Sequence, residues 1–270
     1  MPPLNVVLTN SVCCFSACAL IDLGYDCQIT SVERNPVCRK AATALCGDIF
    51  HYPSHDITKL GQDILSEKFD VMLNSSNCQP LSGCNPFALG WDDPRMHSFV
   101  ATCEARKQWL HVNPLLQSVD ENVVPARHLG SNDFMAELDR MWRLTHQTIN
   151  AKDWGALQSR PRIFATAVDL TKIPGSDPPE LNYMLNDGFR ILKPHSPCIV
   201  ASKITHNPPM ATHVRSGISR QFDNDEAMQV MGYPDTVLGD SILGLSPAQV
   251  RNLLGSAYDY VHLWFILRRI

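Results

Sequence analysis

The sequence predicts an α/β fold, a doubly wound parallel sheet with helices on both faces, together with a second, smaller lobe. Segments typical of strands alternate with segments typical of helices from Asn5 to Val168, and this alternation favours a parallel sheet. Prolines then cluster from Ile173 to Asn224, where the helical periodicity fades. The length of 270 residues has room for one large domain with a small partner.

The first half of the chain contains three predicted strands and two predicted helices. The first helix ends at Gly24, and Pro36 lies in the first turn of the second helix, where its missing N–H costs nothing. The predicted strands are Asn5–Thr9, Cys27–Val32 and Phe69–Leu73, and the predicted helices are Ser16–Leu23 and Asn35–Cys46.

The second half continues the pattern and then changes. Helices are expected at Met96–Trp109 and Asp133–Thr148, and strands at Leu115–Asp120 and Arg162–Val168. After the proline-rich stretch we expect a helix around Asp225–Met231 and a final helix from about Pro247. We therefore predict a large domain of residues 1–170, a small lobe of residues 171–224, and helices in residues 225–270 that complete the large domain.

Composition and charge limit the classes of function. With 44% hydrophobic and 19% charged residues the chain is ordinarily globular, and its net charge of −4 gives no global attraction to nucleic acid. The ten cysteines include no CxxC pair, so we expect no metal site. We expect free thiols in a reducing compartment instead. The apolar run Val6–Ile21 lacks a basic flank and contains Asn10, so we expect a cytoplasmic or nuclear protein without a membrane partner.

Four polar segments follow one another in a distinctive order. The first, Ser75–Ser82, comes directly after a predicted strand and contains Cys78. The second lies at the end of another strand, the third enters a strand, and the fourth opens the last predicted helix. These three are Asp120–Val123, Gln158–Arg162 and Asn252–Ala257, and two further stretches, Gly90–Arg95 and Met231–Asp235, lie between them.

Together these segments resemble the cytosine-C5 DNA methyltransferases. That family carries Pro-Cys-Gln at its nucleophile, then Glu-Asn-Val, a Gln-x-Arg-x-Arg element and a final helix with Gly-Asn-Ala/Ser. The resemblance covers nearly the whole chain. It implies a Rossmann-like S-adenosylmethionine-dependent methyltransferase fold, in which residues 1–170 are the catalytic domain and residues 171–224 a small target-recognition lobe.

The resemblance also implies a chemistry. Cytosine C5 becomes nucleophilic when a thiolate adds at C6; Cys78 would be that thiolate and Glu121 would assist at N3. Arg160 and Arg162 would hold the cytosine, which must be flipped out of its duplex, and the loop Ser82–Met96 would close over it. From the residues alone, a buried loop cysteine, a solvated carboxylate at a helix start and a solvated arginine pair stay open.

S-adenosylmethionine is the cofactor that the resemblance implies. Glu33 has the place of the acid that takes the ribose hydroxyls. Gly47–Ile49 and His55–Thr58 compete for the Gly-Asp-Ile element that contacts the adenine, and the spacing to the nucleophile favours Asp56. Ser256 replaces the usual asparagine of the last helix.

The turn after the first strand departs from the family pattern. Family members have Phe-x-Gly-x-Gly-Gly there, because the backbone must approach the cofactor and adopt φ > 0. Here Asn10–Ala17 contains no glycine, and Asn77 replaces the proline before the nucleophile. We therefore expect Cβ atoms to crowd the methionine moiety and cofactor binding to be weak.

The stretch Gly188–Phe222 is the one part of this acidic chain that is biased towards phosphate. It contains no Asp or Glu, and it lies where family members keep their target-recognition region. Its DNA-binding candidates are Arg190, Lys193, Lys203, Arg215 and Arg220. An ordinary solvated loop region is the alternative.

We therefore predict a DNA (cytosine-5-)-methyltransferase. The alternative is a catalytically impaired homologue that acts as a DNA-binding or regulatory protein, with room for a partner protein. An enzyme on the same scaffold that acts on RNA, or uses another one-carbon donor, is permitted by the short lobe but has no positive support.

Overall fold

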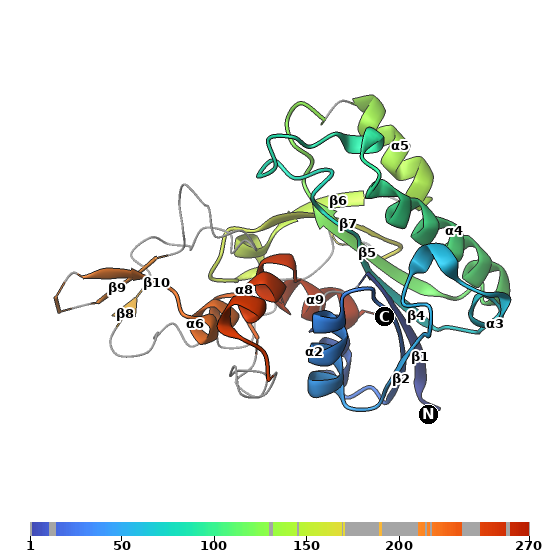
Figure 1. Ribbon diagram of the computed structural model, residues 1–270, viewed down its shortest axis with the longest axis horizontal. Coiled ribbons are helices and arrows are strands. Elements are labelled where there is room, and N and C mark those ends of the chain that lie inside the picture. The colour runs from blue at the N-terminus through green and yellow to red at the C-terminus, as the bar shows by residue number, and fades with distance from the viewer. Residues whose placement is uncertain are drawn as a thin grey trace.

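Seven strands form one mixed sheet in the order β3-β2-β1-β4-β5-β7-β6 (Figure 1). The computed structural model describes residues 2–10, 15–129, 132–144, 146–168, 170, 189–190, 210–213, 215–216, 218–233, 244–257 and 260–269. The strands are β1 (Leu4–Thr9), β2 (Cys27–Val32), β3 (Ile49–His51), β4 (Val71–Ser75), β5 (Gln117–Val123), β6 (His146–Asn150) and β7 (Pro161–Thr166). All are parallel except β7, which pairs antiparallel with both β5 and β6.

The order of the strands creates a crevice at one edge of the sheet. From β1 the chain proceeds outward to β2 and β3, and it then returns to add β4 on the other side of β1. The connections after β1 and β4 therefore leave the sheet in opposite directions. Open α/β sheets bind their ligands at this point, outside the carboxyl ends of the strands.

Helices cover both faces of the sheet, as predicted (Figure 1). Alternate residues of β1 face opposite sides: Val6 and Leu8 belong to a core cluster with the last helices, whereas Val7 packs with Trp109. One face carries α1 (Phe15–Asp22), α2 (Pro36–Cys46), α8 (Pro247–Ser256) and α9 (Tyr260–Leu267); the other carries α3 (Gln62–Leu65), α4 (Met96–Val112) and α5 (Asn132–Trp142).

The start of each helix in the C-terminal part of the chain has a clear local cause. Asp223 caps α6 (Asn224–Val230) and Ser246 caps α8, each in a reciprocal capping box with the third helical residue. A separate antiparallel sheet of β8 (Phe189–Arg190), β9 (Met210–His213) and β10 (Ser219–Gln221) precedes them, in the order β10-β9-β8. Figure 1 shows this sheet beside α6, at the end of the molecule away from α4.

Three sequence predictions of local structure are wrong. The predicted helix Asp133–Thr148 ends at Trp142, and its last residues belong to β6, because pairing with β7 overrides the local helical pattern. The strand predicted to end at Asp120 continues through Val123. The segment Asn252–Ala257 closes α8 instead of opening the last helix.

The last helix is almost wholly apolar, and this reflects burial within the protein. Residues of α9 pack against α1 in the main core. In the described part of the chain, no helix combines the length and the apolar character needed to cross a membrane.

Candidate active site

Cys78 lies in a tight turn directly after β4, at the carboxyl edge of the sheet. Its carbonyl oxygen accepts hydrogen bonds from the backbone N–H groups of Leu81, at 3.0 Å, and Ser82, at 2.8 Å. Asn77 Oδ1 accepts the N–H of Gln79 at 3.0 Å. The side chain of Asn77 therefore stabilises this turn at the position where family members have proline.

The Ser82–Met96 loop is anchored at several points. The N–H of Ala126 donates to the carbonyl of Leu81 at 2.7 Å, and the N–H of Gly90 donates to Pro80 at 3.0 Å. Gly90 has φ +59, and a Cβ there would lie 3.1 Å from Leu129 and from Phe134, so glycine fits this close approach. Closure of the loop over a target base stays a prediction.

Glu121 and Arg162 form a buried ion pair next to this turn. Arg162 Nε lies 2.8 Å from Glu121 Oε1, and both side chains are less than a tenth exposed. The hydroxyl of Ser75 donates to Glu121 Oε2 at 3.2 Å. Glu121 lies inside β5, so the alternative of a solvated carboxylate at a helix start is wrong.

Sequence reasoning missed Ser75, although it lies three residues before the nucleophile. It faces Glu121 because β4 and β5 pair in parallel with these two residues in register. The sequence could have indicated that Ser75 and Glu121 both lie near strand ends. It could not indicate that they face each other, because the register of β4 against β5 depends on the packing of the whole sheet.

Arg160, in the segment Gln158–Arg162, contacts the segment Asn252–Ala257. Its guanidinium is fully buried, and Nη2 donates to the carbonyl of Ala257 at 2.5 Å and to that of Gly255 at 3.3 Å. Ser256 lies between these two acceptors, at the end of α8. The structure thus brings the predicted catalytic residues and Ser256 together from the turn after β4, from β5, from the start of β7 and from the end of α8.

Glu121, Arg162 and Arg160 all act on the pKa of the Cys78 thiol. Burial raises the pKa of the Cys78 thiol, and the negative charge of Glu121 raises it further, whereas Arg162 and Arg160 lower it. The net pKa is raised, so the thiol is mostly protonated at neutral pH. A ligand that neutralises Glu121 would favour the thiolate.

The two predicted cofactor acids lie after β2 and β3, at the same edge of the sheet. Glu33 is 9% exposed, and its Oε1 accepts the N–H of Asn35 at 2.7 Å; burial raises its pKa to about 7. Asp56 accepts hydrogen bonds from the N–H and the hydroxyl of Thr58. Arg34 Nε lies 3.8 Å from Asp56 Oδ2 and also acts on Glu33.

Binding of the ribose and adenine of a cofactor by Glu33 and Asp56 stays a prediction. The backbone at Asn35 and Arg34 donates hydrogen bonds to the Glu33 carboxylate, which fixes its position at the end of β2. The competing segment Gly47–Ile49 lies at the end of α2 and the start of β3, at the opposite edge of the sheet. The geometry therefore favours Asp56 over Asp48.

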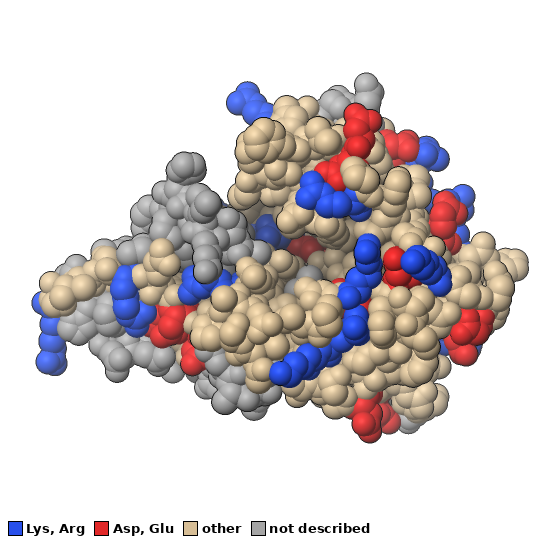
Figure 2. All heavy atoms as spheres, in the orientation of Figure 1, with Lys and Arg blue, Asp and Glu red and all other residues tan. Residues whose placement is uncertain are grey.

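The surface around the crevice carries both signs of charge. Figure 2 shows a hollow near the middle of one face, above α8 and α9 in this view, with Lys and Arg side chains around it. A cavity of about 900 Å³ beside β2, β3 and α3 is lined by the competing segment Gly47–Ile49, but by none of the favoured site residues.

The predicted DNA-binding residues are only partly described. Arg190 lies in β8, Arg215 is exposed between β9 and β10, and Lys193 and Lys203 lie outside the described residues. Arg220 binds the fully buried Glu226 through both guanidinium nitrogens, at 2.6 and 2.7 Å. This ion pair gives Arg220 a structural role, whereas phosphate contact by the others stays a prediction.

Solved structures of methyltransferases share this fold over nearly the whole chain. The Dnmt2 methyltransferase of S. pombe is 15% identical with a TM-score of 0.72, over 98% of this chain and 97% of that chain. The methyltransferase EhMeth of Entamoeba histolytica is 14% identical with a TM-score of 0.70, over 99% and 98%. A mutant of Spodoptera frugiperda DNMT2 is 17% identical with a TM-score of 0.69, over 98% of each chain.

No family model and no curated protein matches the sequence. At these low identities the structural likeness establishes the fold. The predicted Rossmann-like methyltransferase fold is thus confirmed, and with it the resemblance to C5 methyltransferases at the level of three-dimensional structure.

Proposed function

We propose that this chain transfers a methyl group from S-adenosylmethionine to C5 of cytosine in DNA, through a covalent bond between Cys78 and C6 of the base. One observation carries the proposal: the turn that holds Cys78 lies against the buried Glu121–Arg162 pair and Arg160. These residue types at a strand-end crevice suit a nucleophile with an adjacent acid and fixed positive charge.

The side chains have separate roles in the reaction. As Cys78 adds at C6 of the flipped cytosine, its thiol proton passes to the carboxylate of Glu121, and Glu121 delivers this proton to N3. Arg162 holds Glu121 in place, and together with Arg160 it stabilises the thiolate. The positive field of these two arginines compensates for the burial that disfavours the thiolate.

The remaining steps restore the enzyme. When bound, S-adenosylmethionine would supply the electrophilic methyl group that C5 takes up, with S-adenosylhomocysteine as the leaving group. The C5 proton then passes to a base, the bond between C6 and Cys78 breaks, and N3 returns its proton to Glu121. Glu33 and Asp56 would hold the ribose and adenine at the neighbouring strand ends.

DNA that carries 5-fluorocytosine tests this proposal. Fluorine at C5 cannot leave as a proton, so the adduct should persist after methyl transfer and appear in denaturing gels and mass spectra. Adduct should require the cofactor and Cys78. Glu121→Gln should lower its yield by about 10²-fold or more, the usual contribution of a general acid.

Cys84→Ser is the matched control, because Cys84 is an exposed thiol in the same loop. Its adduct yield should equal that of the wild type. An adduct that survives in Cys78→Ser, or no adduct with any DNA sequence at saturating cofactor, contradicts the proposal. RNA with the same base should be tried in parallel, and an adduct with RNA alone would reassign the substrate.

A catalytically impaired, DNA-binding homologue is the second candidate. The observation in its favour is the turn from Asn10 to Ala17, which lacks glycine. This candidate predicts salt-sensitive DNA binding without measurable affinity for S-adenosylhomocysteine. Isothermal titration of the purified protein with that ligand separates the two functions.

A further inference from the structure

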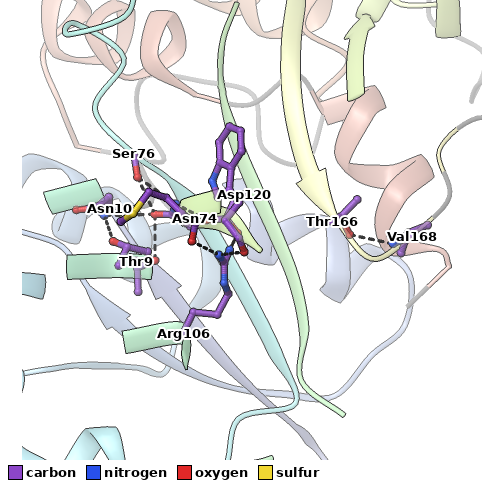
Figure 3. A network of polar contacts seen from close by, with 11 residues as sticks. Thr9, Asn10, Asn74, Ser76, Arg106, Asp120, Thr166 and Val168 are labelled. Atoms are coloured by element: carbon purple, nitrogen blue, oxygen red, sulfur yellow. Dashed lines mark hydrogen bonds and ion pairs between the residues drawn. The ribbon is translucent and has the colours of Figure 1, made fainter. Parts of the chain in front are cut away.

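A buried network of polar side chains joins four elements behind the candidate active site. Figure 3 shows Thr9 and Asn10 from the end of β1 beside Asn74 and Ser76 from the end of β4, with Asp120 and Arg106 adjoining them. Thr102 of α4 also belongs to this network through Asn10. The network lies where the chain departs from the family pattern, at the entry to the turn after β1.

Asn10 adopts a backbone conformation that most residues avoid. Its φ is +50, in the left-handed region where asparagine is tolerated better than most non-glycine residues. Its backbone N–H donates to the carbonyl of Val32 at 3.1 Å. Its side-chain Nδ2 donates to Thr102 Oγ1 at 2.9 Å and to Asn74 Oδ1 at 3.3 Å. Asn10 therefore supplies the positive φ of a glycine and is held there by its own side chain.

Asn74 is the centre of the network, and its neighbours fix its orientation. Its Nδ2 donates to Asp120 Oδ1 at 2.8 Å and to Ser76 Oγ at 3.0 Å. Because Asp120 also accepts a hydrogen bond from Arg106, at 2.5 Å, the amide nitrogen of Asn74 must face it. The amide oxygen is thereby directed towards Asn10 and Thr9, and it accepts from Thr9 Oγ1 at 3.1 Å.

We infer that Asn10, Asn74 and Thr102 form a clamp that fixes the backbone at Asn10, where the chain enters a turn that lacks the glycines of C5 methyltransferases. This inference rests on the proposed function for its link to the cofactor. The same Asn74 amide holds Ser76, two residues before Cys78, and Asp120, next to Glu121. The clamp thus ties the cofactor side of the crevice to the nucleophile side.

The clamp accounts for a retained nucleophile beside a turn without glycine. A glycine provides conformational freedom but has no side chain, so it cannot itself make side-chain hydrogen bonds that hold the backbone in place. Here one asparagine provides both the left-handed backbone and two bonds to rigid elements. The three members belong to different elements, so each can be changed separately.

Variants of Asn10 and Thr102 test the clamp. Asn10→Gly keeps the backbone freedom and removes both side-chain bonds, Asn10→Ala removes both, and Thr102→Val removes one acceptor. The first readout is the protection factor of the residue 10 amide in hydrogen exchange without ligand. The second is affinity for S-adenosylhomocysteine. We expect Asn10→Gly to lower both by about tenfold, the equivalent of two modest hydrogen bonds, and Asn10→Ala to lower both by about fivefold more.

Arg143→Gly is the matched control, because Arg143 also has a positive φ, of 53, but is exposed beyond the end of α5. It should change neither readout. Unchanged protection in Asn10→Gly and Thr102→Val overturns the clamp, and lower protection with unchanged affinity overturns its link to the cofactor. If the wild type binds no S-adenosylhomocysteine, the proposed function fails, whereas the exchange measurements still decide whether the clamp exists.

Discussion

Replacing Glu33 by glutamine should remove a pH dependence from the stability of this protein. Burial raises the pKa of Glu33 from 4.5 to about 7, although the N–H of Asn35 and the charges of Arg39 and Arg34 oppose the shift. The folded protein therefore holds this proton at pH values where the unfolded chain has lost it. The stability that it contributes is fully present below pH 4.5 and is lost as pH rises through 7.

The size of the effect follows from the shift. The difference between 4.5 and about 7, at about 1.4 kcal/mol for each pH unit, corresponds to roughly 3 kcal/mol. Relative to wild type, the free energy of unfolding of Glu33→Gln should thus increase by about this amount between pH 4.5 and pH 8. Glutamine has nearly the same shape and carries no charge, so the comparison isolates the ionisation of Glu33.

Urea denaturation of both proteins at several pH values measures this difference. Glu67→Gln is the control, because Glu67 is an exposed carboxylate of the same domain, and it should show no such trend. A difference between Glu33→Gln and wild type that is constant from pH 4.5 to pH 8 would refute the reasoning. It would mean that Glu33 is solvated or paired more strongly than its surroundings indicate.

Three further changes follow from the geometry of the site. Arg162→Met should abolish trapping by 5-fluorocytosine and lower the free energy of unfolding by about 3–5 kcal/mol, because it leaves Glu121 buried without its cation. Urea denaturation measures the second effect, and a fully stable variant would contradict it. Alkylation of Cys78 by iodoacetamide, followed by mass spectrometry, should be slow at neutral pH, since burial raises the pKa of the thiol. The alkylation rate should keep rising at pH values where that of an ordinary thiol is constant. A plateau near neutral pH would show that the two arginines outweigh burial in setting this pKa. Removing the charges of Lys193 and Lys203 should flatten the slope of log affinity for DNA against log salt by about one for each lost phosphate contact; an unchanged slope would move the DNA surface elsewhere.

Local signals in the sequence predicted most of the helices and strands in the right order, but not β3 or β6. The start of α2 follows from Asn35, whose side chain caps the helix, and from Pro36 in its first turn. Cys78 was predicted from the order of the segments that resemble C5 methyltransferases, and its position directly after a strand was read from local residues. Short-range features of this kind depend on neighbours in the chain, so they can be deduced from the sequence alone.

Only the tertiary structure decided which side chains meet. Ser75 faces Glu121 because of the register of β4 against β5, and β6 exists because β7 offers it a partner. The joining of Asn10 to Asn74 depends on strands that are adjacent in the sheet and 64 residues apart in the chain. These contacts form through burial and strand pairing over long separations, which depend on the packing of the whole sheet and leave no local pattern in the sequence.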